Sequence, residues 1–252
     1  MDGERKPLFL LSDSQSLFRV GSGSLLPGLQ ECLGVSERSV TKAAYIGVSN
    51  GDAPEFFELF VGAMDGINLH DSRMIRSGFD SEDRAFLEGA DLVVLAGGDV
   101  DDGLEIMKRT GMDSALIRKY YEGAVILGVS AGAMQLGLGW WGKRDGGMVD
   151  GLRIVPYYVG VHGERNDWNE LRTLVEAREE FAKGFGIPLG GAMIVHPDLT
   201  MEALRHPVSE FERSGGGQGR LKGNLLLPPV EAIGSSSHTQ TRLRIGDSHV
   251  DE

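Results

Sequence analysis

A serine flanked by small residues stands where an apolar run of the chain ends. The segment reads Ala124-Val-Ile-Leu-Gly-Val-Ser-Ala-Gly-Ala-Met, and its centre has the form G-x-S-x-G around Ser130. Small residues on both sides allow a sharp turn from a strand into a helix, so the serine hydroxyl projects from the end of the strand. The helix N-terminus then places backbone N–H groups and partial positive charge beside that hydroxyl. The segment predicts a nucleophile elbow at Ser130; a tight turn that only packs a strand against a helix is the alternative.

A second turn rich in glycine follows the preceding apolar run, in Leu92-Val-Val-Leu-Ala-Gly-Gly-Asp. In a parallel sheet this turn lies at the same edge as Ser130, where open α/β sheets bind their ligands. A Gly-Gly pair can direct a backbone N–H toward the serine. The N–H groups of Gly98 and Ala131 are therefore the predicted oxyanion hole, which stabilises the negative charge of a tetrahedral intermediate. Taken alone, the segment also fits an ordinary strand-to-helix turn.

The elements that must position these turns alternate along the first half of the chain. Short apolar runs bounded by Gly, Ser or Asp are typical of strands buried on both faces of a parallel sheet. These runs are Leu8–Leu11, Ala43–Val48, Leu92–Ala96 and Ala124–Val129. Segments with helical spacing lie between and after them: Pro54–Met64, Ser81–Gly89, Gly103–Arg109 and Met112–Tyr121. The alternation predicts a doubly wound, mostly parallel α/β sheet with helices on both faces.

The second half of the chain has weaker patterns. We expect a long charged helix over Asn166–Lys183, with a buried stripe made by Trp168, Leu171, Leu174, Val175 and Phe181. Short strands are expected at Leu152–Val155, Tyr157–Val161, Ala192–Val195 and Leu225–Leu227. No repeat or linker divides the chain. We predict one α/β hydrolytic domain over residues 1–234 and a polar, flexible tail over residues 235–252.

Composition excludes several classes of protein. The 252 residues include 25 Lys and Arg against 37 Asp and Glu, which gives a net charge of −12. The chain therefore lacks the excess of basic residues that is typical of nucleic-acid-binding proteins. No run reaches the roughly 18 apolar residues that a membrane span needs. The polar N-terminus has no secretory apolar segment, and the single cysteine, Cys32, excludes an internal disulfide. We therefore expect a cytoplasmic protein with neither nucleic acid nor membrane as partner.

The acidic cluster Asp99, Asp101 and Asp102 is more typical of a helix N-terminus than of a cation site. It lacks the closing glutamate of a calcium loop, and no P-loop pattern occurs in the chain. No metal or organic cofactor is expected.

The Gly-Gly-Asp99 turn, the Ser130-Ala-Gly-Ala elbow and a histidine some thirty residues later resemble the serine peptidases of the dipeptidase E (aspartyl dipeptidase) and cyanophycinase family. The likeness covers about residues 6–200. It implies a fold related to class I glutamine amidotransferases, with serine in place of the usual cysteine. It also implies cofactor-independent hydrolysis of small peptides or isopeptides, often at acidic dipeptides or aspartate-backbone polymers.

The resemblance implies a role for each residue that matches the family pattern. Ser130 matches the nucleophile, and His162, 32 residues later, matches the general base that takes the serine proton and returns it to the leaving amine. Asp145, 15 residues after the serine, matches the acid that orients the histidine. Asp150 and Glu164 remain open as alternatives for that acid.

Two departures from the family pattern concern specificity. The family turn commonly reads Gly-Gly-Asn, whereas Asp99 stands here, and a carboxylate near the site would disfavour an acidic substrate by like-charge repulsion. Arg165 and Arg172 are the nearest basic residues that could grip an acidic side chain, but Asp167 stands where the dipeptidase arginine is expected. Asp99 and Arg165 are the predicted substrate-binding residues, and aspartyl specificity does not follow from the sequence.

Two other functions fit parts of the pattern. A non-catalytic binding or regulatory protein of the amidotransferase-like fold could have kept the elbow. An esterase of the α/β-hydrolase type shares G-x-S-x-G, but its histidine lies much farther downstream, where only His238 and His249 occur in the polar tail. Aromatic residues expected at the surface, such as Phe56, Phe57 and Tyr120, would allow a homodimer.

Overall fold

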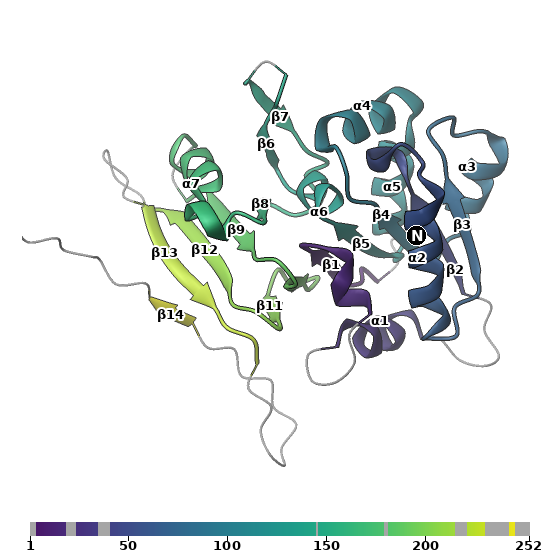
Figure 1. Ribbon diagram of the computed structural model, residues 1–252, viewed down its shortest axis with the longest axis horizontal. Helices are drawn as coiled ribbons and strands as arrows, with labels where there is room; N and C mark the ends of the chain where they lie inside the picture. Colours follow the sequence, from purple (N-terminus) through teal and green to yellow (C-terminus); the bar gives the residue numbers. More distant parts are fainter. Residues whose placement is uncertain are drawn as a thin grey trace, which may run out of the picture.

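The computed structural model describes residues 4–18, 24–34, 41–144, 146–178, 181–214, 221–229 and 242–244. Within these ranges the chain forms a seven-stranded sheet, a five-stranded sheet and a two-stranded hairpin (Figure 1). The first sheet and its helices occupy the larger part of the molecule, and the second sheet lies beside it (Figure 1). No helix in the described ranges is long and apolar enough to cross a membrane.

The seven-stranded sheet confirms the predicted mostly parallel α/β architecture. Its order is β11-β10-β1-β5-β4-β2-β3, with the last five strands parallel and β10 and β11 antiparallel beside β1. The parallel strands are β1 (Leu8–Leu11), β2 (Lys42–Ile46), β3 (Asp71–Ile75), β4 (Leu92–Leu95) and β5 (Val125–Val129); β10 is Ala192–Val195 and β11 is Met201–Leu204. Leu11 pairs with Val129 and Leu95 with Gly128, so the carboxyl ends of β1, β4 and β5 meet at one edge.

Helices cover both faces of this sheet. Helices α1 (Leu25–Leu33) and α2 (Pro54–Asp65) pack on one face, and α3 (Ser81–Glu88), α4 (Val100–Thr110), α5 (Met112–Tyr121) and α6 (Ala131–Leu136) pack on the other. The sequence of β1 is continuously apolar because both of its faces are buried. Leu8 and Leu10 belong to one hydrophobic cluster, and Phe9 and Leu11 belong to the other. Burial on both faces removes the alternation expected of a half-exposed strand.

The five-stranded sheet has the order β14-β13-β12-β9-β8. Its strands are β8 (Tyr158–Val161), β9 (Lys183–Ile187), β12 (Val208–Arg213), β13 (Leu221–Leu226) and β14 (Arg242–Arg244). Helix α7 (Asn169–Glu176) packs on this sheet and buries Trp168, Leu171, Leu174 and Val175 together with Phe211. Strand β14 lies within the segment 235–252 that the sequence predicts as a tail.

The prediction of a long helix over Asn166–Lys183 is wrong. A short 3-10 turn, η3 (Glu164–Asn166), precedes α7, which ends at Glu176, and Phe181 of the predicted stripe is 67% exposed. A Cβ on Gly184 would lie 2.6 Å from the Val175 side chain, so glycine in β9 lets the helix lie directly on the strand. The chain therefore turns back after two helical turns instead of continuing outward.

Two other expectations fail, the second of them in part. The segment Leu152–Val155 is not a strand, because its N–H groups instead donate to the last carbonyls of α6, such as Leu152 N–H to Gln135 O at 2.7 Å. Of the aromatic residues expected at the surface, Phe56 is exposed, Phe57 is half-buried and Tyr120 is buried.

Candidate active site

Ser130 occupies a strained turn between β5 and α6. Its φ is 50° and its ψ −109°, a conformation that side chains with a Cβ rarely adopt. Its N–H donates to Leu11 O at 2.9 Å, and its carbonyl accepts from the N–H groups of Ala133 and Met134 at 3.0 and 3.1 Å. These bonds hold the turn from the strand side and from the helix side, so the chain has the strand–turn–helix arrangement of a nucleophile elbow.

The two glycines of G-x-S-x-G are required because neighbouring backbone atoms lie too close for a side chain at either position. A Cβ on Gly132 would lie 2.3 Å from Leu95 O, and a Cβ on Gly128 would lie 2.7 Å from Ala133 N. Helix α6 thus begins in contact with the backbones of β4 and β5. Substitution at either glycine would push the helix, and Ser130 with it, away from the sheet edge.

The turn after β4 provides the second part of the predicted oxyanion hole. Gly98 has a φ of 138°, and a Cβ there would lie 2.0 Å from Ser49 O, so only glycine fits. The next N–H, of Asp99, donates to Ser49 O at 2.7 Å. By contrast, the N–H groups of Gly98 and Ala131 donate to no group within the described ranges. Both residues line a cavity with Ser130, so these two donors are available to a bound oxyanion.

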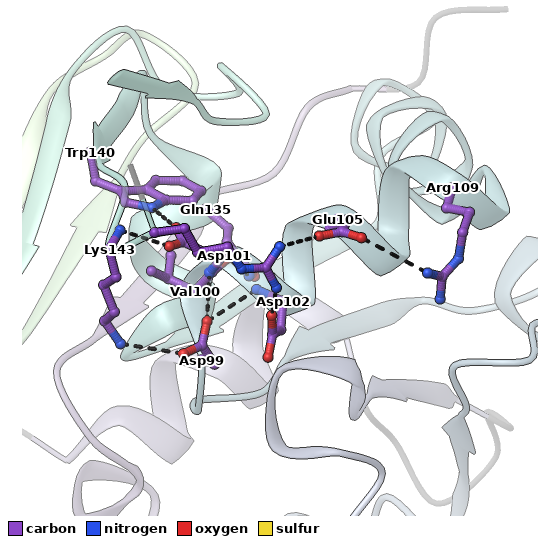
Figure 2. A network of polar contacts seen from close by, with 10 residues as sticks. Asp99, Val100, Asp101, Asp102, Glu105, Arg109, Gln135, Trp140 and Lys143 are labelled. Carbon is purple, nitrogen blue, oxygen red and sulfur yellow. Dashed lines mark hydrogen bonds and ion pairs between the residues drawn. The ribbon is translucent and has the colours of Figure 1, made fainter. Parts of the chain in front are cut away.

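A buried amide ties this turn to its neighbours. Gln135 of α6 is fully buried, and its Nε2 donates to Val100 O at 3.0 Å (Figure 2). The same Nε2 donates to Ser49 Oγ at 3.1 Å. Ser49 belongs to the 3-10 turn η2 (Val48–Asn50), which packs against α4. One side chain therefore joins the helix that follows Ser130 to the helix that follows Gly98.

Asp99 caps helix α4. Its Oδ1 accepts from the N–H groups of Asp101 and Asp102 at 2.9 and 3.0 Å (Figure 2). These bonds, chiefly the one from Asp102, hold the pKa of the Asp99 carboxyl below its ordinary value, and Lys143 acts in the same direction. Predicted as a substrate-binding residue, Asp99 is occupied by this capping role and lines neither of the cavities described below.

The hairpin of β6 (Gly139–Trp141) and β7 (Met148–Asp150) is fastened to the acidic start of α4 (Figure 2). Trp140 Nε1 donates to Asp101 Oδ1 at 2.6 Å, and the Lys143 N–H donates to Asp101 Oδ2 at 2.9 Å. The Lys143 ammonium lies 3.4 Å from Asp99 Oδ2, and Arg144 pairs with Asp102 and Glu105. Asp145, the predicted orienting acid, follows in this loop and lies outside the described residues.

His162 follows β8 and is held less firmly than the serine. Its φ is 58°, its N–H donates to Ile187 O at 3.3 Å, and its side chain is exposed. Within the described part of the chain, no hydrogen bond or ion pair joins the imidazole to another side chain. His162 nevertheless lines the same two cavities as Ser130. The structure thus brings the predicted nucleophile and base to one place.

The other predicted site residues lie apart from this place. Asp150 pairs with Arg153 at 3.9 Å, and Glu164 accepts from the Leu189 N–H at 3.3 Å. Arg165 is exposed on η3. Arg172 pairs with Asp167. None of these residues lines either cavity.

Two cavities meet at Ser130, with volumes of about 610 and 300 Å³, and Gly98, Ser130 and His162 line both. The larger lies between α6, the β6–β7 hairpin, β8 and α7; the smaller is bounded by the 3-10 turn η1 (Ser14–Leu17) and α2. Volumes of this order are typical of small-molecule sites. A chain lying across Ser130 would therefore reach both cavities.

Several residues of the cavity walls were not predicted from the sequence. Trp140, Trp141 and Trp168 line the larger cavity, although their sequence pattern fits core packing equally well. Asp13 lines the smaller one, where its carboxylate accepts from the N–H groups of Gln15 at 2.8 Å and Gly190 at 2.6 Å. Its place directly after the apolar run of β1 was the signal that could have found it, because that strand ends at the edge occupied by Ser130. In the described ranges, no group of three or more His, Cys, Asp or Glu side chains is placed to hold a metal ion.

Comparison with known proteins agrees with this geometry. Residues 8–201 match the family model of peptidase family S51. A peptidase from an acI-B1 Actinobacterium has a similar structure, with a TM-score of 0.65 and 15% identity over 88% of this chain and 95% of that one. A putative peptidase E protein from Listeria monocytogenes EGD-e gives a TM-score of 0.59 and 17% identity over 81% of this chain and 100% of that one. A search of curated proteins found no match.

The protein is therefore a serine-type peptidase with a mixed α/β fold. Because the match spans most of the sequence, the chain belongs to peptidase family S51, the family of dipeptidase E and cyanophycinase.

Proposed function

We propose that the protein is a cofactor-independent exopeptidase that cleaves small peptides or isopeptides with Ser130 as nucleophile. The observation that carries the proposal is the strained Ser130 turn at the junction of two cavities, beside two N–H groups that donate to no described residue. A turn that served only to pack β5 against α6 would require neither the free donors nor the cavities.

The reaction begins when Ser130 Oγ attacks the scissile carbonyl carbon and its proton passes to a ring nitrogen of His162. The negative charge that develops on the carbonyl oxygen is stabilised by the N–H groups of Gly98 and Ala131. His162 then gives the proton to the leaving amine, and an acyl-serine ester remains. His162 next takes a proton from water as the water attacks the ester. It returns this proton to Ser130 Oγ as the ester C–O bond breaks, which restores the serine hydroxyl and releases the carboxylic acid product.

Proton transfer requires the imidazole within about 3 Å of the serine oxygen, a distance that often forms only when substrate binds. The shared cavities and the exposure of His162 support such a movement. Asp145 remains our proposed orienting acid, because it follows Trp141, Gly142 and Lys143, all of which line the larger cavity.

Digestion of a defined mixture of di- to octapeptides, followed by mass spectrometry of the products, tests this function. We expect wild type to release terminal residues or dipeptides and Ser130→Ala to release none. Ser114→Ala, an exposed serine on α5, is the matched control and should equal wild type. Equal product release by Ser130→Ala would contradict the proposal. No hydrolysis by a folded wild-type protein would favour the non-catalytic binding protein.

A further inference from the structure

The wall of the larger cavity is mainly aromatic and aliphatic. The chain contains three tryptophans, and Trp140, Trp141 and Trp168 all line this cavity. Leu171 and Leu174 of α7 add aliphatic surface beside them. Aromatic rings provide large apolar contact areas with defined geometry, so this wall matches an apolar ligand group.

The charged side chains that line the cavity do not suit an acidic ligand group. Among its described lining residues, the acidic and basic ones besides His162 are Lys143 and Glu170. Lys143 already lies 3.4 Å from Asp99, whereas Glu170 makes no hydrogen bond or ion pair with any described residue. An acidic side chain would therefore meet an unpaired carboxylate and a cation that is already paired. The net charge of −12 adds to this repulsion.

We propose that the larger cavity is a side-chain pocket for an apolar, preferentially aromatic, residue of the substrate and that Glu170 disfavours acidic residues there. The proposal deepens the proposed peptidase function and rests on it for its catalytic consequences. A carboxylate near the pocket lowers the affinity for an acidic substrate group, because binding brings two like charges together and removes water from them.

Two dipeptide series, Xaa-Ala and Ala-Xaa with Xaa as Phe, Leu, Asn or Asp, measure this preference on both sides of the scissile bond. In the series whose Xaa enters the pocket, we expect kcat/KM for Phe to exceed that for Asp by about tenfold or more. The Asn and Asp substrates differ by charge at nearly equal shape, so their ratio isolates the electrostatic part. Equal or higher kcat/KM for Asp than for Phe in both series would overturn the proposal.

Glu170→Gln should raise kcat/KM for Asp relative to Phe several-fold, because it removes the repelling charge while keeping the shape of the side chain. Glu176→Gln is the matched control, since Glu176 is exposed on the same helix and does not line the cavity. Trp141→Ala should lower kcat/KM for Phe and leave that for Asp nearly unchanged. An unchanged Asp-to-Phe ratio in Glu170→Gln would show that this residue does not discriminate.

Binding can be followed without catalysis, because every tryptophan of the chain lines this cavity. Tryptophan fluorescence of Ser130→Ala is titrated with N-acetyl-phenylalaninamide and with N-acetyl-aspartamide carrying a free side-chain carboxylate. We expect the apolar probe to shift the emission with a Kd about tenfold lower than that of the acidic probe. Tighter or equal binding of the acidic probe, or no spectral change with either, would overturn the pocket assignment. Failure of a fluorophosphonate to label wild-type Ser130, with the apolar preference in binding intact, would instead reject the peptidase function and leave the pocket standing.

Discussion

Ser130 and His162 both follow a strand and both have positive φ, yet their surroundings differ. Backbone hydrogen bonds hold the Ser130 turn on the sheet side and on the helix side, and at the flanking glycines an added Cβ would lie within 2.7 Å of backbone atoms. His162 is exposed, and among the described residues its backbone N–H donates to Ile187 O. The proposed nucleophile follows a strand of the parallel sheet, and the proposed base follows a strand of the smaller sheet beside it.

This contrast indicates how the site is divided between rigid and adjustable parts. The proposed nucleophile and oxyanion donors lie in turns that backbone hydrogen bonds and close packing hold in place, as electrostatic preorganisation requires. The proposed base, His162, is exposed, so its side chain has room to adjust when a substrate binds. Substitutions on the two sides should therefore differ in their effects on stability and on rate.

The largest effect is expected from removing the base. His162→Gly fits the positive φ and should lower kcat by about 10³- to 10⁶-fold, with little change in the free energy of unfolding because the side chain is exposed. Added imidazole should restore part of the rate. Steady-state kinetics and urea unfolding measure both quantities, with His70→Ala, exposed and outside both cavities, as the control. Activity within tenfold of wild type would remove His162 from the mechanism.

A substitution at Gly98 should damage both rate and stability. Gly98→Ala places a Cβ 2.0 Å from Ser49 O and forces the turn to move, so one oxyanion donor is displaced. We expect kcat to fall about 10²- to 10³-fold and stability to fall by about 1–3 kcal/mol. Gly62→Ala in α2 is the contrasting glycine, because nothing lies within 4 Å of the position that its added methyl group would occupy, and a small gain in stability is expected. Equal behaviour of the two variants would contradict the tight fit at Gly98.

Removal of the amide that links α6 to the Gly98 turn should have a smaller effect. Gln135→Leu leaves Val100 O without its donor and breaks the bond to Ser49. We expect a loss of about 1–3 kcal/mol in urea unfolding and a lower kcat, since both helices at the site are joined by this side chain. Gln30→Leu on α1, which lies outside both cavities, should leave kcat unchanged. A stable Gln135→Leu protein with full activity would show that the link does not position the turn.

The smallest effect concerns the cap of α4. Asp99→Ala should cost about 1 kcal/mol at neutral pH, and Asp99→Asn much less because asparagine also caps helices. The folded-state pKa of Asp99 lies below its ordinary value of 3.8, so its stabilisation is present above that pH and is lost as the pH falls through the folded-state pKa. The difference in stability between wild type and Asp99→Ala should therefore shrink in strong acid. A difference that stays constant with pH would contradict the assigned role of the carboxylate.

The elements of the fold differ in how well the sequence predicts them. The helix Met112–Tyr121 and the strand Leu8–Leu11 are predicted with the bounds that the structure has, because regular apolar spacing and burial on both faces leave clear patterns in the sequence. The strand Lys183–Ile187 is not predicted, because two glycines interrupt the apolar pattern of this strand. The expected helix instead extends to Lys183, the first residue of the strand.

At the site, the sequence predicts the two tight turns, because their backbone conformations restrict which residues fit there. Ser130 and Gly98 each need a local conformation that small residues reveal in the sequence. The cavity walls could not be found in this way, because Trp140 and Trp168 come from separate segments that only the packing of the hairpin and α7 brings together.

The central claim is that Ser130 is a nucleophile activated by His162. Intact-protein mass spectrometry after treatment with a fluorophosphonate tests it most directly, because only an activated serine reacts. We predict one adduct on wild type, none on Ser130→Ala and little on His162→Gly. An unlabelled wild type under conditions in which a control serine hydrolase reacts, or equal labelling of Ser130→Ala, would contradict the claim.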